Sequence, residues 1–413
     1  MGGGGRAGTA VSTAEEAPVL GLKPAGPPSL TWAQARETAR RAGSRPLPPE
    51  LLDLAGALGR TLAEPLTALT DLPAFDTSAM DGWAVSGPGP WRVAGRLLAG
   101  EPAGAPLADG AAVEIATGAQ LPPGATAVLR REHGGQDGVL LHDRTPGSLT
   151  TGQDVRPRGQ ECRRGEVLLP VGTRVGPAVL GLAAASGHDR LAVRRRPVVE
   201  LLVLGDELLG SGLPRPGLVR DALGPLLPPW LRAAGAEVGA VRAVRDDFGL
   251  LRDAVRHSAA DVVVTTGGTA AGPVDFLHRA LAEAGGRLLV DGVAVRPGHP
   301  MLLAELPGGR HLVGLPGNPL AAVAGTVTLA LPLLHARGGR SAGEPVLAPA
   351  AVELPGHPAD TRLLPVRRTL RGAVPLAFDG PAMLRGLARA EALAVVPPGG
   401  VAAGEAVELL DTP

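Results

Sequence analysis

The spacing of hydrophobic residues changes several times along this chain, and each change indicates a different kind of structure. Thr31 and Gln34 have the spacing of a capping box, so we expect a short helix over residues 31–42. A second helix is predicted from Pro49, because the apolar residues at positions 51, 52, 55 and 58 would lie on one helix face. The N-terminal part is therefore predicted to begin with two helices.

Residues 65–158 follow a different pattern, in which short apolar runs alternate with Pro and Gly turns. That pattern favours a β-rich domain with irregular loops. Residues 159–196 return to a helix flanked by short strands. We therefore interpret the β-rich segment as an insertion into an N-terminal α+β domain.

From residue 197 the chain alternates between continuous apolar runs and helical patterns. Continuous apolar runs are typical of strands buried on both faces, and their alternation with helices predicts an open, mostly parallel α/β sheet. The predicted strands are Val198–Leu204, Val262–Thr266, 288–295 and 312–315, and the predicted helices are 222–234, 246–259, 275–284 and a long one that begins at Asn318 and Pro319.

The whole chain is thus predicted to be a multidomain protein of the class α/β plus β. Its parts are a disordered tail (1–29), an interrupted N-terminal α+β domain (30–64 and 159–196), an inserted β-rich domain (65–158), an open α/β domain (197–338) and a small C-terminal β domain (340–413).

The amino-acid composition says little about the fold, but it excludes several classes of function. The 413 residues carry a formal net charge of zero and 2% aromatic side chains, which argues against nucleic-acid binding. Cys162 is the only cysteine, which excludes internal disulfides and fits a reducing cytoplasm. The start shows no secretory signal, and the most apolar segment, 321–334, is too short to span a membrane and contains Pro332. We expect a cytoplasmic protein without membrane or nucleic-acid partners.

Three turns are predicted to meet beyond the carboxyl ends of the strands, where open α/β sheets bind ligands. They lie at 205–208, 266–272 and 315–319. Gly267 and Gly268 would let the backbone approach a ligand closely, and Pro319 would start a helix whose N–H groups face an anion. One such turn is more often structural, but three at one edge favour a phosphate-bearing ligand.

Four acidic residues fall at the same edge, namely Asp206, Glu207, Asp246 and Asp275. Helix capping would explain some of them, Asp246 in particular. An anionic ligand beside several carboxylates needs a cation, however, and Mg²⁺ prefers carboxylate and phosphate oxygens. We therefore expect a Mg²⁺ site with Asp206, Glu207 and Asp246 as ligands.

A second polar cluster lies in the β-rich segment. Asp76, Ser78 and Asp81 stand among apolar neighbours in a loop that leads into a strand, and Thr117 follows another strand. By pattern alone, these residues would form turns with local side-chain hydrogen bonds.

Longer motifs make the interpretation more specific. The segments DLPAFDTSAMDGWAV at 71–85 and IATGAQLPPGA at 115–125 are followed by RG at 158–159, GDEL at 205–208, RDD at 245–247, GG at 267–268, RPG at 296–298 and LPGNP at 315–319. In this order and rough spacing, the chain resembles the molybdopterin molybdenumtransferase family (the bacterial MoeA and gephyrin E-domain type) over residues 30–338.

The resemblance implies an enzyme of molybdenum cofactor biosynthesis, with a molybdopterin-binding α/β domain, that uses Mg²⁺ to insert molybdate into adenylylated molybdopterin with release of AMP. The catalytic residues it implies are Asp81, Thr117 and Glu207. The substrate-binding residues it implies are Ser78, Asp246, Gly267, Gly268, Asp275, Arg296, His299, Pro316 and Pro319. It also implies a homodimer in which these elements meet between subunits, and partners such as a molybdopterin adenylyltransferase and molybdoenzymes.

The chain departs from the family pattern at a lysine-rich block. This chain has Gly292, Arg296 and His299 there, and Lys23 is its only lysine. Arg296 fits an arginine-rich background, whereas Gly292 cannot replace a cation.

Two other functions stay open at this point. The chain could be a degenerate paralogue that binds molybdopterin or acts as a scaffold, or its α/β domain could act alone on adenylylated ligands. Asp81 and Thr117 favour the full enzyme, because a nucleotide-handling domain would not need them. A serine hydrolase and a dehydrogenase are disfavoured, since GRSAG at 339–343 follows a helix and no dinucleotide fingerprint follows the first α/β strand.

Overall fold

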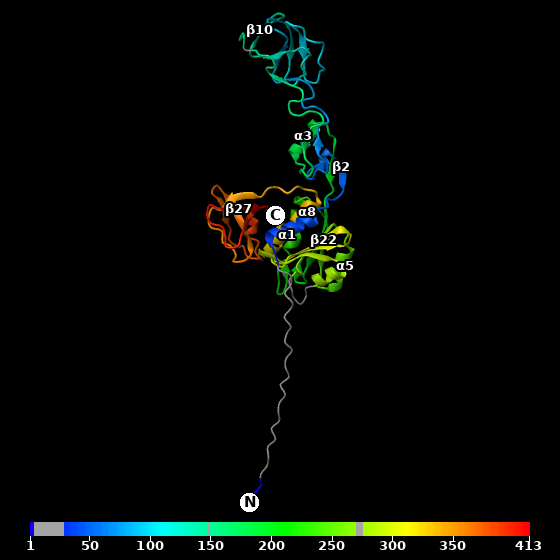
Figure 1. Cartoon of the computed structure of the whole chain (residues 1–413), viewed down its shortest axis with the longest axis vertical. Coiled ribbons are helices and arrows are strands. Elements are labelled where there is room, and N and C mark those ends of the chain that lie inside the picture. Colours follow the sequence, from blue (N-terminus) through cyan, green and yellow to red (C-terminus); the bar gives the residue numbers. More distant parts are fainter. Residues whose placement is uncertain (4–28, 148, 270–275) are drawn as a thin grey trace.

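The computed structural model describes residues 1–3, 29–147, 149–269 and 276–413, so the predicted tail lies almost entirely outside the described residues. The molecule is elongated (Figure 1). A β-rich unit that includes strand β10 lies at one end, and a small unit around helix α3 and strand β2 lies in the middle. The α/β sheet lies beside the C-terminal strands at the other end. This is the multidomain α/β plus β architecture that the sequence predicts.

The β-rich unit is built on a six-stranded sheet with the order β8-β5-β7-β6-β10-β9. Its strands are β5 (Gly82–Val85), β6 (Trp91–Leu97), β7 (Ala111–Ile115), β8 (Ala127–Arg130), β9 (Gly134–Asp137) and β10 (Leu140–Asp143). Trp83 and Trp91 pack with Leu129 in one core, and Ile115 packs with Val128 in another. Strands β4 (Thr77–Ser78) and β11 (Val155–Arg156) pair where the chain enters and leaves this unit.

In the middle unit, the helix predicted from Pro49 is wrong. Pro49–Asp53 form strand β2, not a helix, and β2 pairs antiparallel with β13 (Arg190–Arg194). The side chains of β2 alternate between exposed and half-buried, so its leucines fit a surface strand as well as a helical period. Asp53 then caps the short helix α2 (Leu54–Ala57). The unit also contains β3 (Leu66–Thr67), β12 (Val167–Leu169) and α3 (Pro177–Ala185).

The α/β unit contains a second six-stranded sheet, with the order β17-β14-β18-β22-β21-β19. The first four strands are parallel to one another, and β21 runs antiparallel to both of its neighbours, β22 and β19. The strands are β14 (Val198–Leu204), β17 (Glu237–Val244), β18 (Val262–Thr266), β19 (Arg287–Asp291), β21 (Leu302–Leu306) and β22 (Arg310–Leu315), with the small pair β15 (Leu208–Leu209) and β16 (Val219–Arg220) beside them. The helices are α4 (Leu223–Ala233), α5 (Phe248–His257), α6 (Leu277–Glu283), α7 (Pro319–Gly325) and α8 (Leu331–Arg337), with a π-helical turn (Thr326–Ala330) between the last two.

The single strand predicted at 288–295 is in fact two strands. Gly292 has a φ of +83°, and there the chain leaves β19 and turns into β20 (Val293–Arg296). Strand β20 pairs with β24 (Thr361–Thr369) and with β1 (Leu30–Thr31), so the C-terminal strands share a sheet with a segment of the α/β unit. The other C-terminal strands are β23 (Val346–Pro349), β25 (Gly372–Pro375), β26 (Ala392–Val396) and β27 (Ala406–Leu410).

The apolar helical segment α7–α8 lies in the core. Helix α1 (Trp32–Ala42) packs against it, and the capping box of Thr31 and Gln34 at the start of α1 confirms the prediction. The segment Pro319–Arg337 is long and apolar enough to cross a membrane, but 78% of its most apolar window is buried inside the molecule. That burial is the environment of a core helix.

A buried histidine in β22 should make the stability of the α/β unit depend on pH. His311 is 3% exposed, and burial, followed by the charge of Arg337, lowers its pKa from 6.5 to about 4. Because the folded pKa lies below the unfolded one, this contribution to stability is complete above pH 6.5 and is lost as the pH falls towards 4.

Between pH 7 and pH 5 we expect this loss to reach about 2 kcal/mol. Urea unfolding of His311→Gln should show a pH dependence that is weaker by this amount. The exposed His142 offers a matched control, and His142→Gln should behave like the parent. Equal pH dependence in His311→Gln and the parent would contradict the assignment.

Candidate active site

The three predicted turns begin at one edge of the α/β sheet, and residues 270–272 of the second turn lie outside the described residues. Strands β14, β18 and β22 are parallel neighbours that end at Leu204, Thr266 and Leu315. The N–H group of Gly267 donates to the carbonyl oxygen of Leu315 at 2.8 Å. A Cβ on Gly317 would lie 3.6 Å from the Cα of Gly267, so these two turns are in contact.

Two glycines, Gly267 and Gly268, leave the backbone at this sheet edge uncovered by side chains. We call this part of the α/β sheet the glycine edge. Gly267 and Gly268 have φ values of +88° and +66°, in the left-handed region that residues with a side chain rarely adopt. A Cβ on Gly268 would lie 3.2 Å from Cδ1 of Leu204, and one on Gly267 would lie 3.3 Å from the Leu204 carbonyl oxygen. A ligand at the strand ends can therefore approach the main chain closely.

The start of helix α7 differs from the prediction. The N–H groups of Leu320 and Ala321 both donate to the carbonyl oxygen of Pro381, at 2.9 and 3.3 Å. A loop of the C-terminal unit thus caps the helix, which leaves neither N–H group for an anion. The prediction of an anion-facing helix start at Pro319 is wrong for this reason. Pro316 still stands between Leu315 and Gly317, both of which contact Gly267.

The predicted Mg²⁺ ligands lie at the same edge without forming a metal cage. Oδ2 of Asp246 accepts the backbone N–H of Asp206 at 3.3 Å, and Arg245 pairs with the Asp206 carboxylate at 3.2 Å. Glu207 is exposed next to Asp206, and Asp275 lies outside the described residues. Among the described residues, no three His, Cys, Asp or Glu side chains group as a metal site. Exposed carboxylates of this kind fit a Mg²⁺ ion held largely by substrate phosphates and water.

Asp81 and Thr117 are partners in the β-rich unit. The Asp81 carboxylate accepts the backbone N–H of Thr117 at 2.6 Å and its hydroxyl at 2.8 Å. These two hydrogen bonds, followed by the nearby charge of Arg131, lower the pKa of Asp81 below its usual range. Both residues are exposed, so an ionised carboxylate in a fixed orientation faces solvent.

Ser78 has a different place from the one predicted. It is fully buried, its hydroxyl donates to the carbonyl oxygen of Met80 at 2.5 Å, and its backbone pairs with the strand end near Gly118 and Ala119. A buried hydroxyl with a local partner does not reach a substrate. Ser78 instead holds the turn that carries Asp81.

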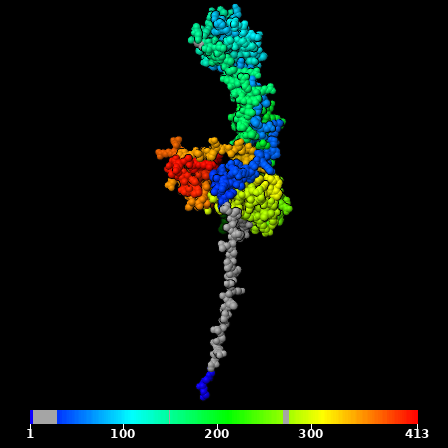
Figure 2. Space-filling model, in the orientation of Figure 1, coloured from blue at the N-terminus to red at the C-terminus, as the bar shows by residue number. Residues whose placement is uncertain are grey.

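The site residues therefore form two groups on one chain. Asp81 and Thr117 belong to the β-rich unit at one end of the molecule, and the glycine edge belongs to the α/β unit at the other end (Figure 1). Figure 2 shows the narrow middle unit between these two ends. Within a single chain the structure does not bring the two groups together.

Comparison with known proteins identifies the family of this chain. Residues 30–187 match the family model of the MoeA N-terminal region (domain I and II), 200–336 match a probable molybdopterin binding domain, and 348–412 match the MoeA C-terminal region (domain IV). A molybdopterin molybdenumtransferase from Synechococcus elongatus is 34% identical over 308 residues, which are 70% of this chain and 76% of that protein. The chain belongs to the MoeA family.

Other MoeA-family proteins match over nearly the whole length. A molybdopterin molybdenumtransferase from Staphylococcus epidermidis is 28% identical over 87% of this chain and 90% of its own length. The crystal structure of a molybdopterin biosynthesis MoeA protein from Pyrococcus horikosii aligns with a TM-score of 0.75 at 27% identity, and covers 93% of this chain and 99% of that one. The resemblance found in the sequence motifs is thereby confirmed.

The structure shows what this MoeA-family chain has in place of the lysine-rich block. A Cβ on Gly292 would lie 3.7 Å from Nε2 of His299, so the imidazole lies beside the position of the missing side chain. Nδ1 of His299 lies 2.8 Å from the carbonyl oxygen of Val293, which fixes the ring. Arg296 donates to Asp360 at 2.7 Å, so its permanent charge is already paired with a carboxylate.

Two features of the site were not visible in the sequence. Arg131 donates its backbone N–H to the Asp81 carbonyl oxygen at 3.0 Å, and its guanidinium carbon lies 5.8 Å from the centre of the Trp83 ring. Asp71, which is 8% exposed, accepts hydrogen bonds from the Arg164 backbone and from the Arg158 side chain, and both lower its pKa. These partners lie far apart in the sequence, and no spacing rule connects them.

Proposed function

We propose that this protein is a molybdopterin molybdenumtransferase, which inserts molybdate into adenylylated molybdopterin and releases AMP. The proposal rests on one observation above all: a MoeA-family chain carries both a bare glycine edge at its α/β sheet and an ionised, oriented Asp81–Thr117 pair on its β-rich unit. A protein that only bound the pterin nucleotide would need the glycine edge alone.

The α/β edge is the proposed binding site of the nucleotide part of the substrate. Gly267 and Gly268 would lie against its phosphates, since no side chain blocks the backbone there. Asp206, Glu207 and Asp246 would hold Mg²⁺ together with those phosphates. When bound, the ion supplies charge neutralisation and Lewis acidity at the phosphoryl group.

Asp81 is the proposed charged positioning group for the second half of the reaction. Its lowered pKa makes it a poor proton acceptor near neutral pH, so a role as general base is disfavoured. Thr117 uses its hydroxyl and its backbone N–H to hold the carboxylate. The pair thus presents a fixed negative charge to the substrate or to its counter-ion.

A homodimer would bring the two groups together. Because they lie at opposite ends of one chain, a complete site needs the β-rich unit of one copy beside the α/β edge of another. In a twofold-symmetric dimer each chain would then contribute one group to each of two sites. We place the dimer in the cytoplasm, between a molybdopterin adenylyltransferase that supplies the substrate and the molybdoenzymes that receive the cofactor.

Mixing two inactive variants tests this arrangement. Asp81→Asn damages one group and Gly268→Val damages the other, so each pure dimer should be nearly inactive. After unfolding and refolding together, half of the dimers would be mixed and each would contain one intact site, which restores roughly a quarter of parental activity. Mixed samples that stay as inactive as the pure variants would contradict a site shared between chains.

The activity itself is measured as AMP release. Purified full-length protein is supplied with adenylylated molybdopterin, Mg²⁺ and molybdate, and AMP is followed by chromatography. We expect turnover that depends on molybdate and stops when a chelator removes the divalent ion. AMP release with no dependence on molybdate would indicate simple hydrolysis of the adenylate and would contradict the proposal.

The replaced lysine block should weaken the response to molybdate. Molybdate is a dianion, Gly292 has no charge, and Arg296 is paired with Asp360. Turnover should therefore saturate only at high molybdate. His299→Lys should lower the half-saturating concentration several-fold, because a lysine there restores a full positive charge beside position 292. Gly292→Lys is the poorer test, since a side chain at a φ of +83° is strained.

An exposed histidine outside the site gives the control for this test, and His142→Lys should leave the molybdate response unchanged. If the parent already saturates at micromolar molybdate and His299→Lys brings no change, another cation serves the oxyanion.

A further inference from the structure

A small cavity lies between the middle unit and the α/β unit, and shares no residue with the two groups described above. Its walls come from the loop at 59–61, from the connection at 194–197 between β13 and β14, and from the C-terminal ends of α4 and α8. The arginines that line it are Arg60, Arg174, Arg194, Arg195, Arg196 and Arg340. The cavity measures ≈ 30 Å³, far below the roughly 300–1,000 Å³ of sites for larger organic ligands, so it suits a single small ion.

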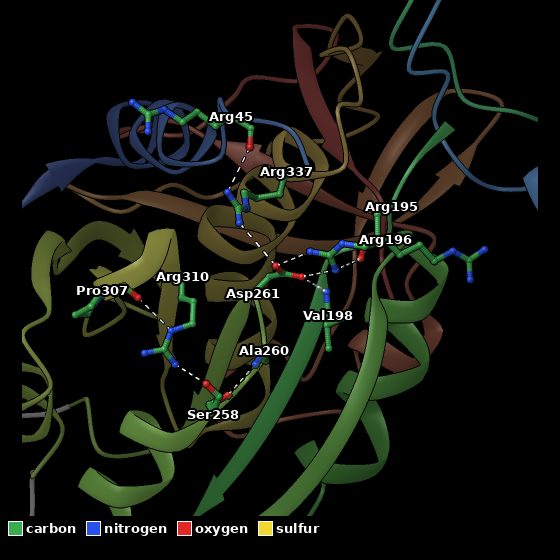
Figure 3. Close-up of polar contacts among 10 residues, drawn as sticks. All are labelled: Arg45, Arg195, Arg196, Val198, Ser258, Ala260, Asp261, Pro307, Arg310 and Arg337. Atoms are coloured by element: carbon green, nitrogen blue, oxygen red, sulfur yellow. Dashed lines mark hydrogen bonds and ion pairs between the residues drawn. The ribbon is translucent and has the colours of Figure 1, made fainter. Parts of the chain in front are cut away.

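Carboxylates neutralise only part of this positive charge. Asp261 accepts both terminal nitrogens of Arg195 at 2.9 Å and the backbone N–H of Val198 at 2.7 Å, and Arg337 lies 3.8 Å from it (Figure 3). In the same view the side chain of Arg196 extends away from Asp261. The Asp261 carboxylate is thus already paired with Arg195, Val198 and Arg337, and it does not neutralise the other arginines of the cavity.

The remaining arginines have few counter-charges. Arg60 lies 3.4 Å from Glu50 and is also within reach of the charge of Glu237. Asp411 is close enough to act on Arg340. In the part of the chain that the structure describes, Arg174, Arg194 and Arg196 form no ion pair with a carboxylate. These three side chains leave the cavity with uncompensated positive charge.

Two of the arginines also carry buried donors that lack an acceptor. The Nε atoms of Arg60 and Arg196 are buried, and neither has a hydrogen-bond partner among the described residues. Buried N–H groups nearly always have an acceptor, so these two donors point to a group with oxygen atoms in the cavity. Burial and then the charge of Arg196 lower the pKa of Arg60, which agrees with crowding of like charges.

The C-terminal ends of two helices offset only part of the positive charge around the cavity. Helices α4 and α8 both end at the cavity, and each C-terminus carries about half a negative charge. Two helix ends therefore offset roughly one positive charge, whereas Arg174, Arg194 and Arg196 carry three. The net charge around the cavity therefore stays positive, which favours an anion there.

We propose that this arginine-lined cavity binds a small tetrahedral oxyanion of the class that includes phosphate, sulfate and molybdate. The forked guanidinium groups of Arg174 and Arg196 match the paired oxygens of such an ion. The bound ion bridges the middle unit, which carries Arg174, and the segment after α8, which carries Arg340. It thus holds together the joint between the two ends of the molecule.

Equilibrium dialysis of full-length protein with radiolabelled inorganic phosphate at low ionic strength tests the proposal. We expect saturable binding that persists in Gly268→Val, which separates this cavity from the α/β edge. The double variant Arg174→Gln/Arg196→Gln should bind phosphate at least about tenfold more weakly, the scale of a lost charge-assisted hydrogen bond. Sulfate and molybdate are added as competitors, and the tighter competitor identifies the preferred oxyanion.

Arg367→Gln is the matched control, because Arg367 is an exposed arginine on the C-terminal strand β24 and should bind phosphate like the parent. If the double variant does not fold, Arg174→Lys/Arg196→Lys keeps the charge and should still weaken binding by removing the fork. The proposal is overturned if none of the three oxyanions binds. It is also overturned if both arginine double variants bind like the parent.

Discussion

Replacing Asp81 by Asn should reduce molybdate-dependent AMP release by roughly 10²-fold, the scale of losing one preorganised electrostatic group from an active site. The substitution keeps the size of the side chain and one acceptor oxygen for Thr117, and removes the negative charge. Because Asp81 is exposed and Asn keeps an oxygen that can accept both hydrogen bonds from Thr117, the fold should be retained. Single-turnover AMP release and thermal unfolding of the same preparation give the two measurements.

A second exposed carboxylate in the same unit provides the control. Asp137 lies on the edge strand β9, and Asp137→Asn should have parental activity and stability. Thr117→Val removes the hydroxyl that donates to Asp81 and keeps the backbone N–H bond, so its loss of activity should be smaller than that of Asp81→Asn. If Asp81→Asn melts far below the parent but keeps full specific activity, Asp81 is a structural turn residue.

Gly268→Val should abolish tight binding of molybdopterin or its adenylate. A branched side chain at a φ of +66° costs roughly 1–2 kcal/mol in the backbone. Its Cβ would also lie 3.2 Å from Leu204, at the point where the ligand must approach the turn. We expect a loss of affinity of more than about tenfold, since both the turn geometry and the approach of the phosphates are disturbed.

Gly404→Val separates backbone strain from site damage. Gly404 has a φ of +87°, a Cβ added there would meet no atom within 4 Å, and the residue lies in the C-terminal unit. This variant should show a comparable cost in stability and unchanged affinity. Parental pterin affinity in a folded Gly268→Val protein would place the ligand elsewhere.

Much of the fold could be predicted because its signals are local. Continuous apolar runs located β14 and β18, and the capping box located α1. The errors came from long-range pairing. Pro49–Asp53 has a helical period as well as a strand alternation, and its pairing with a strand far along the sequence decides between them. The turn at Gly292 needs a positive φ. The sequence does not reveal it, because glycine adopts both positive and negative φ values.

The candidate site likewise has features that local sequence patterns predict and features that only long-range contacts determine. The meeting of the glycine turns at one sheet edge follows from parallel strand order, which the alternating pattern predicts. The cap that Pro381 provides for α7 does not, since a distant loop supplies the acceptor. The burial of Ser78 and the pairing of Arg296 with Asp360 are likewise tertiary facts, which motif position alone could not show.

The central claim, that this chain is a working molybdenumtransferase, is tested most directly by complementation. The parent chain and Asp81→Asn are expressed at equal levels in a bacterial strain that lacks this transferase, and nitrate reductase activity is measured over a range of molybdate concentrations. We predict that the parent restores nitrate reductase activity, with a need for raised molybdate, and that Asp81→Asn does not. If the parent is soluble and binds the pterin in the cell but restores no activity at any molybdate concentration, the chain binds the substrate without converting it.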